Sequence, residues 1–418
     1  MRRVIIVLAG LAMIVTGIVA AFVIHRLQEG RNVRGSSTEE FTLSTTTPAR
    51  PPSPAPAIAW PMYGFDAART RSVDLSLRPP FRKVWTYHAG SLVEFPPAIG
   101  YGRLYFSTNS GKFAAVNAKS GKAAWTYLSH RCVAASPVVG PAQHGSVYAV
   151  FLNRPPCNTR SGGNGKTGEV VDFGSGFGKI RWKRTIGPSE TSPLLAGVRL
   201  YVGDWNGDVW ALDARNGKTI WRYSTGGPVK GGAALAGGRL YVGSYDGHLY
   251  CLAARTGRLI WRTHGQPRLY GGASFYSTPA LAYGRVYIGS TDGKMYSFGA
   301  TTGKLIWSYG TGGYVYASPA VWNGFVLAGS YSGRFYAFDA ATGERRWTFA
   351  ANGPISGSAT VIGDVVYFAT LERRTYALSA RTGKLLWMFP DGKYTPAVAV
   401  KGHLYLVGYA RVYGMVPR

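Results

Sequence analysis

One tryptophan recurs along this chain at intervals close to 40 residues. The intervals between successive copies are 40, 57, 39, 40, 46, 40 and 40 residues. The recurring residues are Trp85, Trp125, Trp182, Trp221, Trp261, Trp307, Trp347 and Trp387. Each complete repeat holds four short apolar or alternating runs separated by glycine-containing turns, as between Ala317 and Phe349. A period of this length built from four strand-like runs predicts an all-β propeller, with one four-stranded blade per repeat.

The number of repeats predicts eight blades. Second strands are recognisable at eight places, from Leu104-Tyr105 to Leu404-Tyr405. The last repeat has no tryptophan strand, whereas the strand around Trp85 precedes the first complete repeat. We therefore expect residues 83–88 to complete the blade that the C-terminus begins, which would close the ring and remove open sheet edges. The eight tryptophans are then structural, each packing against the neighbouring blade.

The turns between second and third strands carry a glycine signal. They read Asn206-Gly207, Asp246-Gly247, Asp292-Gly293 and Ser332-Gly333. Asn-Gly and Asp-Gly favour type I′ turns, in which both central residues have positive φ. The run Asp204-x-Asn206-x-Asp208 resembles the start of a calcium loop, but Arg215 stands where such a loop needs glutamate. We interpret it as a turn and predict no metal site.

Composition narrows the classes of protein. Gly accounts for 56 of 418 residues, aromatic residues for 14% and charged residues for only 16%, which disfavours a helical bundle and global disorder. The formal net charge is +28. Such a field attracts anionic polymers and lipid surfaces, but the basic residues are spread evenly over the turns. No nucleic-acid module appears, so we predict no specific nucleic-acid binding.

The N-terminal residues predict a membrane anchor. Residues 1–3 form a short tail, and residues 4–24 are an uncharged run long enough to span a hydrocarbon core of about 30 Å. A cleaved signal peptide is the alternative, although its apolar region is usually shorter. Residues 25–59 are predicted to be a linker rich in Ser, Thr and Pro, which stays extended. We expect a single-pass protein with its propeller, residues 60–418, outside the cytoplasm.

Three cysteines are present: Cys132, Cys157 and Cys251. None forms a C-x-x-C pair, which excludes thioredoxin-like, zinc-ribbon and c-haem sites. Cys132 and Cys157 bracket an irregular region, and a disulfide between them is one interpretation for an exported domain. Two separate thiols are the other. Residues 153–168 replace a tight turn, and such inserts on rigid scaffolds often carry recognition.

The repeat, with its SP-A, [LV]-Y-[VI]-G-S and A-x-T-G-[KR]-x-x-W segments, resembles the pyrroloquinoline-quinone-like propeller repeat. Trp60-Pro61-Met62-Tyr63-Gly64 resembles the lead-in of that family. The resemblance covers about residues 60–418 and implies the fold. The family includes quinoprotein dehydrogenases, an outer-membrane assembly lipoprotein and sensor ectodomains. Dehydrogenase membership would imply a bound quinone (PQQ), Ca²⁺, an Asp base and adjacent cysteines, and this chain has no adjacent cysteine pair.

A candidate site follows from aligning the first strands. The residues three positions before the anchoring Pro or Ala would form a ring at one mouth of the central channel. The candidates in that ring are Glu94, Glu190, Lys230, Tyr276, Tyr316 and Lys393. Converging carboxylates, ammonium groups and tyrosines could bind a polar ligand or partner. The alternative is a solvated mouth whose charges balance each other. No catalytic motif accompanies the ring.

These observations favour a monomeric, membrane-tethered, non-catalytic propeller that acts as a binding or scaffold module in the cell envelope. Its partner would be an envelope protein or an anionic polymer, and it would need no cofactor. The alternative function is a PQQ-dependent, alcohol dehydrogenase-like oxidoreductase, which would require PQQ and Ca²⁺. The sequence identifies no catalytic residue for it.

Overall fold

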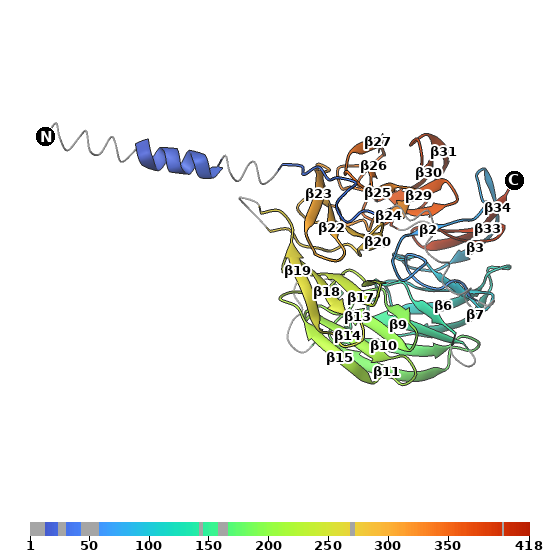
Figure 1. The fold of residues 1–418 in the computed structure, drawn as a ribbon. Helices are drawn as coiled ribbons and strands as arrows, with labels where there is room; N and C mark the ends of the chain where they lie inside the picture. The colour runs from blue at the N-terminus through green and yellow to red at the C-terminus, as the bar shows by residue number, and fades with distance from the viewer. Residues whose placement is uncertain are drawn as a thin grey trace, which may run out of the picture.

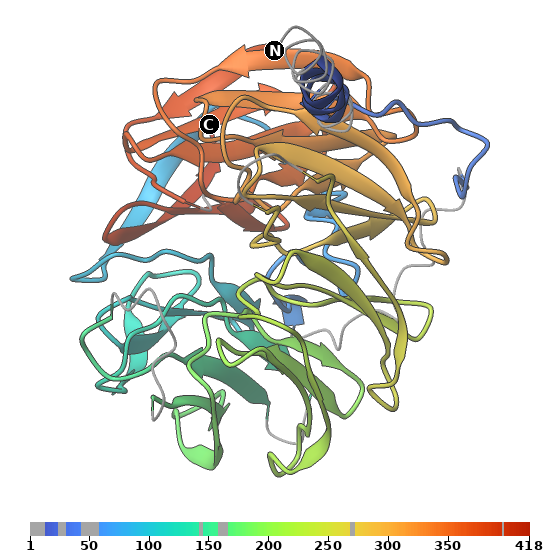
Figure 2. The ribbon, with the colours of Figure 1, turned by 90° about the vertical axis from the view of Figure 1, so that its left-hand side faces the viewer.

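The structure is a computed structural model that describes residues 13–23, 31–42, 58–141, 145–157, 166–267, 272–394 and 397–418. It is an eight-bladed all-β propeller, as the repeat predicted. The blades follow one another around a centre in chain order (Figure 1). Figure 2 shows blades 4 and 5, in yellow and light orange, from the side that faces left in Figure 1.

Each of the first four blades is an antiparallel sheet of consecutive strands, numbered outward from the axis. Blade 1 contains β4 (Ala98–Gly100), β5 (Arg103–Ser107), β6 (Lys112–Asn117) and β7 (Ala123–Leu128), with β1 (Ile58–Trp60) added beside β4. Blade 2 contains β8 (Val138–Gly140), β9 (Ser146–Phe151), β10 (Gly168–Gly174) and β11 (Ile180–Ile186). Blade 3 contains β12 (Leu194–Ala196), β13 (Arg199–Gly203), β14 (Asp208–Asp213) and β15 (Thr219–Ser224). Blade 4 contains β16 (Ala234–Ala236), β17 (Arg239–Gly243), β18 (His248–Ala253) and β19 (Leu259–His264).

The last four blades repeat this arrangement, except that the eighth uses both ends of the propeller. Blade 5 contains β20 (Ala280–Ala282), β21 (Arg285–Gly289), β22 (Lys294–Gly299) and β23 (Leu305–Gly310). Blade 6 contains β24 (Ala320–Trp322), β25 (Phe325–Gly329), β26 (Arg334–Asp339) and β27 (Arg345–Ala350). Blade 7 contains β28 (Thr360–Ile362), β29 (Val365–Thr370), β30 (Arg374–Ser379) and β31 (Leu385–Phe389), with β2 (Ser72–Val73) parallel to β28. Blade 8 contains β32 (Ala397–Val400), β33 (His403–Val407), β34 (Arg411–Pro417) and β3 (Phe81–His88).

The core lies between adjacent blades. Middle strands such as β13 are apolar on both faces and almost wholly buried, because a blade packs on each side of them. The outermost strands alternate instead: β7 has the exposure pattern of a strand with one packed face and one solvated face.

Strand β3 joins the C-terminal strand β34. The two are antiparallel, with His88 opposite Arg411 and Phe81 opposite Pro417. The sequence had assigned the strand around Trp85 to this blade. Residues from the beginning and end of the propeller therefore share one sheet.

The recurring tryptophans link each blade to the next. Seven of them donate an indole N–H hydrogen bond to a backbone carbonyl of the following blade, at 3.0 to 3.3 Å. The glycine of the next blade's T-G-[KR] type turn lies against the ring. A Cβ added at Gly303 would approach the ring of Trp261 to 2.7 Å. The structural interpretation of these tryptophans is confirmed.

Because of this contact, we expect a single added methyl group at the glycine to destabilise the fold. Gly303→Ala would place its Cβ against Trp261 at a φ of +73°, whereas Gly102→Ala, at a φ of +70°, has no atom within 4 Å of its added Cβ. We expect Gly102→Ala to lower the free energy of unfolding by about 1 kcal/mol and Gly303→Ala by about 2–4 kcal/mol. Denaturant unfolding of both variants measures the difference. Equal losses would contradict the packing role of the glycine.

The type I′ prediction for the turns is wrong. Gly207, Gly247 and Gly333 have positive φ, but the residue before each does not. The N–H of Gly207 donates to the carbonyl of Asp204 at 3.1 Å, as in a type I turn followed by a left-handed glycine. The Asp204 side chain explains why this turn is type I, because its carboxylate accepts hydrogen bonds from the N–H groups of Asn206 and Asp208 and rigidifies the turn.

The predicted membrane-spanning helix is not supported by the structure. Residues 13–23 are helical, while residues 4–12 and 24 of the predicted span lie outside the described residues. In the part of the chain that the structure describes, no helix combines the length and apolar character needed to cross a membrane.

Part of the predicted linker packs on the ring. Residues 31–42 follow the outer side of blade 5, where Val33 pairs with Ser308. The guanidinium of Arg285, a fully buried residue, donates to the carbonyls of Ser36 and Glu39. The Phe41 and Tyr283 rings lie 5.4 Å apart. The sequence did not predict these contacts, because they depend on a complementary surface contributed by residues more than two hundred positions away.

Candidate functional site

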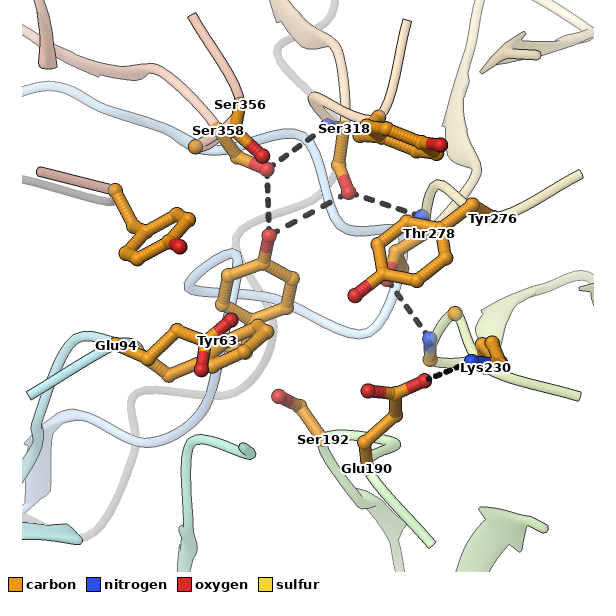
Figure 3. A pocket seen from close by; sticks show the side chains of 16 residues that line it. Tyr63, Glu94, Glu190, Ser192, Lys230, Tyr276, Thr278, Ser318, Ser356 and Ser358 are labelled. Atoms are coloured by element: carbon orange, nitrogen blue, oxygen red, sulfur yellow. Dashed lines mark hydrogen bonds and ion pairs between the residues drawn. The ribbon is translucent and has the colours of Figure 1, made fainter. Parts of the chain in front are cut away.

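The candidate site is the mouth of the central channel. A cavity of about 40 Å³ lies there, lined by segments that lead into the first strands of the blades (Figure 3). Five of the six predicted residues line it: Glu94, Glu190, Lys230, Tyr276 and Tyr316. The residues precede their strands, so each projects from a short loop anchored by the strand behind it.

An ion pair with an aromatic support occupies one side of the mouth. The Lys230 Nζ lies 3.3 Å from the Glu190 Oε1, which also accepts a hydrogen bond from the Trp205 indole at 3.1 Å. The same ammonium lies 4.4 Å from the centre of the Trp205 ring. Burial raises the pKa of Glu190, and the Lys230 charge opposes that rise. The pair is therefore held in one geometry while its charges still face the cavity.

Glu94 lies across the mouth from this pair (Figure 3). Burial and the negative charge of Glu190 raise its pKa to about 7, while the Lys393 charge lowers it. Lys393 itself does not line the cavity, and Tyr394 takes that place. The Lys393 ammonium lies 5.2 Å from the centre of the Tyr409 ring.

This environment makes stability depend on pH. Below the ordinary pKa of 4.5 the Glu94 carboxyl is neutral in both the folded and the unfolded chain. Between 4.5 and about 7 it ionises in the unfolded chain but keeps its proton in the folded chain, so the free energy of unfolding falls as pH rises. We therefore expect Glu94→Gln to match the wild type near about pH 4 and to exceed its free energy of unfolding by about 2 kcal/mol near about pH 8, since water in the mouth screens part of the effect. Denaturant unfolding at the two pH values measures this. The exposed Glu344→Gln is the control, and a difference independent of pH would contradict the assignment.

Tyrosines form an arc that begins beside the Glu190–Lys230 pair, where the Lys230 ammonium lies 5.2 Å from the centre of the Tyr245 ring. The Tyr276 ring lies 5.0 Å from Tyr316 and 6.1 Å from Tyr245, and Tyr316 lies 5.1 Å from Tyr331. All three contacts are edge-to-face, a favourable arrangement for aromatic rings. The arc presents apolar faces and hydroxyl groups side by side, which is the surface chemistry enriched in protein interfaces.

Tyr63 closes the floor of the mouth. Its hydroxyl is 2.6 Å from the Ser358 Oγ and donates to the Ser318 Oγ at 3.4 Å (Figure 3). These serines belong to a series of hydrogen bonds around the axis. In each bond the hydroxyl of one blade accepts a hydrogen bond from a backbone N–H of the segment that leads into the preceding blade. The N–H of Thr278 donates to Ser318, and that of Ser318 donates to Ser358. The signal was the Ser or Thr before the anchoring Pro or Ala in six of the eight repeats, which the sequence analysis did not use.

Two buried arginines hold the segment that carries Tyr63. Arg69 and Arg71 are 0% and 1% exposed, and they donate to backbone carbonyls of several first strands and the loops before them. Arg69 reaches the carbonyls of Ser192 and Ala233, and Arg71 reaches that of Pro319. Backbone bonds from Val139, Leu235, Leu281, Val321 and Val361 to the same segment add to these. The lead-in residues therefore form a plug that contacts most of the blades.

The insert in blade 2 begins beside the mouth. Cys132 and Cys157 form a disulfide with Cα atoms 5.6 Å apart. Cys132 packs with Leu152 and Trp205, the residue that supports Glu190 and Lys230. Residues 158–165 of the insert lie outside the described residues. The bridge connects the base of the insert to the ion pair through one layer of side chains.

A quinone with calcium does not fit this mouth. The cavity of about 40 Å³ holds about three waters, whereas pockets for such ligands measure about 300–1,000 Å³. The carboxylates of Glu94 and Glu190 would repel a quinone that itself carries carboxylates. Calcium takes about 6–8 oxygen ligands, and no group of three His, Cys, Asp or Glu side chains among the described residues could hold a metal ion.

Comparison with solved structures places the fold among known propellers. BamB from Moraxella catarrhalis superposes with a TM-score of 0.63, 19% identity, and coverage of 81% of this chain and 100% of that chain. A quinohemoprotein alcohol dehydrogenase from Comamonas testosteroni superposes with a TM-score of 0.71 and 16% identity, covering 86% of this chain and 80% of that chain. At these identities the similarity shows the fold alone.

Sequence comparison is more specific. A stretch of 129 residues is 29% identical to the outer membrane protein assembly factor BamB of Alkalilimnicola ehrlichii, covering 30% of this chain and 31% of that protein. The match thus spans about a third of that relative's length. The pattern of the family described as outer membrane protein assembly factor BamB matches residues 149–223, 205–315 and 311–413, together more than half of the chain. The chain belongs to the BamB family of β-propellers.

Proposed function

We propose that this protein is a membrane-tethered, non-catalytic scaffold of the cell envelope that binds a protein partner at its central mouth. One observation carries the proposal: a paired charge and an arc of tyrosines converge on a mouth whose floor is closed by Tyr63. The cavity suits the tip of a partner's side chain better than a small molecule, given its volume of about 40 Å³.

The chemistry of the mouth favours a protein over a polymer of repeating anions. Tyrosine and tryptophan supply a large contact area at low conformational cost, and they are the residues most often dominant in binding energy. The carboxylates Glu94 and Glu190 would attract a basic or hydroxyl-bearing side chain and repel an anionic one. A partner from outer-membrane protein assembly is consistent with what the curated relative is named for.

The proposed tethering and location are supported by the N-terminal residues and by the disulfide. The uncharged run over residues 4–24 has the length of a membrane anchor. Residues 31–42, which pack on blade 5, would hold that anchor close to one side of the ring. The Cys132–Cys157 disulfide suits an oxidising compartment outside the cytoplasm.

The alternative, a PQQ-dependent oxidoreductase, is favoured only by the shared fold with the quinohemoprotein dehydrogenase. Calorimetric titration of the full chain with PQQ, with and without Ca²⁺, separates the two functions. We expect no binding heat from a protein shown to be folded by its unfolding transition. Calcium-dependent binding at about micromolar affinity or tighter would overturn the scaffold function.

A further inference from the structure

A second cavity lies between blades 7 and 8, separate from the mouth. Its volume is about 280 Å³, and its lining includes His88, Arg373, Asp391, Tyr409 and Arg411. Blades 7 and 8 are neighbours around the ring (Figure 1). The lining residues come from the turn between β29 and β30, the loop after β31, the turn that leads into β34 and the end of β3. We call this cavity the blade 7–8 groove. Nothing in the proposed scaffold function uses it.

Arg373 departs from the pattern of the other blades. It occupies the turn position that is glycine in blades 1, 3, 4, 5 and 6, namely Gly111, Gly207, Gly247, Gly293 and Gly333. Its φ of +54° keeps the same left-handed conformation, and its N–H donates to the Thr370 carbonyl as the glycines' N–H groups do in their turns. A left-handed arginine costs about 1–2 kcal/mol relative to glycine. The turn tolerates a long cation where a glycine would be more stable.

The Arg373 guanidinium packs against the Tyr409 ring, and the Lys393 ammonium lies near the same ring. The Arg373 guanidinium lies 4.0 Å from the centre of the Tyr409 ring, and the Lys393 ammonium lies 5.2 Å from it. The backbone of Tyr409 is fixed by a hydrogen bond, in which its N–H donates to the Asp391 Oδ1 at 2.9 Å. The geometry therefore fixes two positive groups on one ring at the edge of the groove.

The positive charge of the groove is not compensated by its single carboxylate. Asp391 is 9% exposed, and its oxygens accept hydrogen bonds from the N–H groups of Gly392 and Tyr409 and from the Tyr413 hydroxyl. Among the described residues, neither Arg373, Lys393 nor Arg411 forms an ion pair within 4.0 Å of a carboxylate. Elsewhere on the ring, cations such as Arg222 and Arg346 do have such partners.

We propose that the blade 7–8 groove binds a phosphate-bearing group. Two guanidinium groups, those of Arg373 and Arg411, line the concavity, and the Lys393 ammonium lies against the Tyr409 ring at its edge. This charge matches a dianion better than a monoanionic carboxylate, and arginine binds phosphate oxygens in a fork geometry. The aromatic ring of Tyr409 supplies a flat wall for the group that carries the phosphate. The phosphate could belong to a soluble monoester or to a lipid whose headgroup is a phosphate monoester, and both present the same dianionic group.

The test is calorimetric titration of the full chain, in nonionic detergent, with inorganic pyrophosphate as the probe. Arg373→Gln and Arg374→Gln are a matched pair, because they remove the same charge from adjacent exposed residues and only the first lines the groove. We expect Arg373→Gln to weaken binding about ten- to hundredfold and Arg374→Gln to change it by less than about twofold. Arg373→Gly should also lose binding while its unfolding midpoint stays at or above that of the wild type, since it restores the glycine of the other blades.

Vesicles distinguish the two sources of the phosphate. Cosedimentation with vesicles that contain phosphatidic acid, a lipid with a phosphate monoester headgroup, is compared with cosedimentation with phosphatidylcholine vesicles for the same variants. Loss of cosedimentation in Arg373→Gln alone supports a lipid headgroup, whereas loss of pyrophosphate binding alone supports a soluble ester. Equal weakening by Arg373→Gln and Arg374→Gln would overturn the site, because it would reflect only the general positive field of a chain with net charge +28. Absence of pyrophosphate binding together with equal cosedimentation of all variants would also overturn it.

Discussion

Deletion of residues 411–418 is expected to abolish the folded ring rather than to shorten it. These residues form β34, which pairs with β33 on one side and with β3 on the other. Without β34, both neighbours lose their hydrogen-bonded partner, and β3 has no sheet to join. The deletion also removes the buried side chains of Val412 and Met415 from the core shared with blades 1 and 7.

The measurement is calorimetric unfolding with near-ultraviolet circular dichroism. We expect the deletion variant to show no cooperative transition, whereas deletion of Arg418 alone leaves the transition nearly unchanged. Trp85→Ala provides a milder test of the same closure, because the Trp85 indole donates to the Ala118 carbonyl of blade 1 at 3.2 Å. A deletion variant that retains the wild-type transition would show that this pairing does not hold the ring together.

Trp307→Ala is expected to lower the free energy of unfolding by about 3–5 kcal/mol. The Trp307 side chain is 0% exposed, and its indole donates to the Ala340 carbonyl at 3.0 Å. Its removal leaves a cavity between blades 5 and 6 and removes one hydrogen bond between them, although Tyr287 and Arg285 still donate to the Ala340 carbonyl. Gly343 lies directly against the ring, so no side chain is present to fill the space.

The matched control for that variant is Trp322→Ala. Trp322 is partly exposed and does not belong to the recurring set. We expect it to cost less than half as much as Trp307→Ala. Denaturant unfolding of the two variants gives the comparison, and similar losses would mean that the recurring tryptophans have no special role in joining the blades.

The periodic part of the molecule was predictable from the sequence. The spacing of the tryptophans gave the blade number because one bulky residue per repeat must contact the next blade, and a glycine such as Gly303 must lie under it. The mouth was also partly predictable: residues at equal positions in successive repeats, such as Glu190 and Lys230, converge at the axis of a ring.

The parts that break the repeat were not predictable in the same way. Tyr63 contacts serine hydroxyl groups and Arg69 donates to backbone carbonyls of several blades, so their role appears only when the ring is assembled. The turn type was missed because Asp204 stabilises a type I turn through its own side chain, which the Asn-Gly dipeptide does not reveal. Lys393 was placed in the mouth by alignment, but it does not line the cavity, and its ammonium lies 5.2 Å from the centre of the Tyr409 ring.

The most direct test of the scaffold function is site-specific photo-crosslinking in the living host. A photoreactive amino acid replaces Tyr316, which lines the mouth, or Tyr223, on the outer strand β15 and away from it. We expect the Tyr316 position to give a discrete covalent adduct with an envelope protein, lost when Glu190→Ala is added, and the Tyr223 position to give none. Adducts at Tyr223 alone, or no adduct at Tyr316 in a folded and correctly exported protein, would contradict the assignment of the mouth as the partner-binding site.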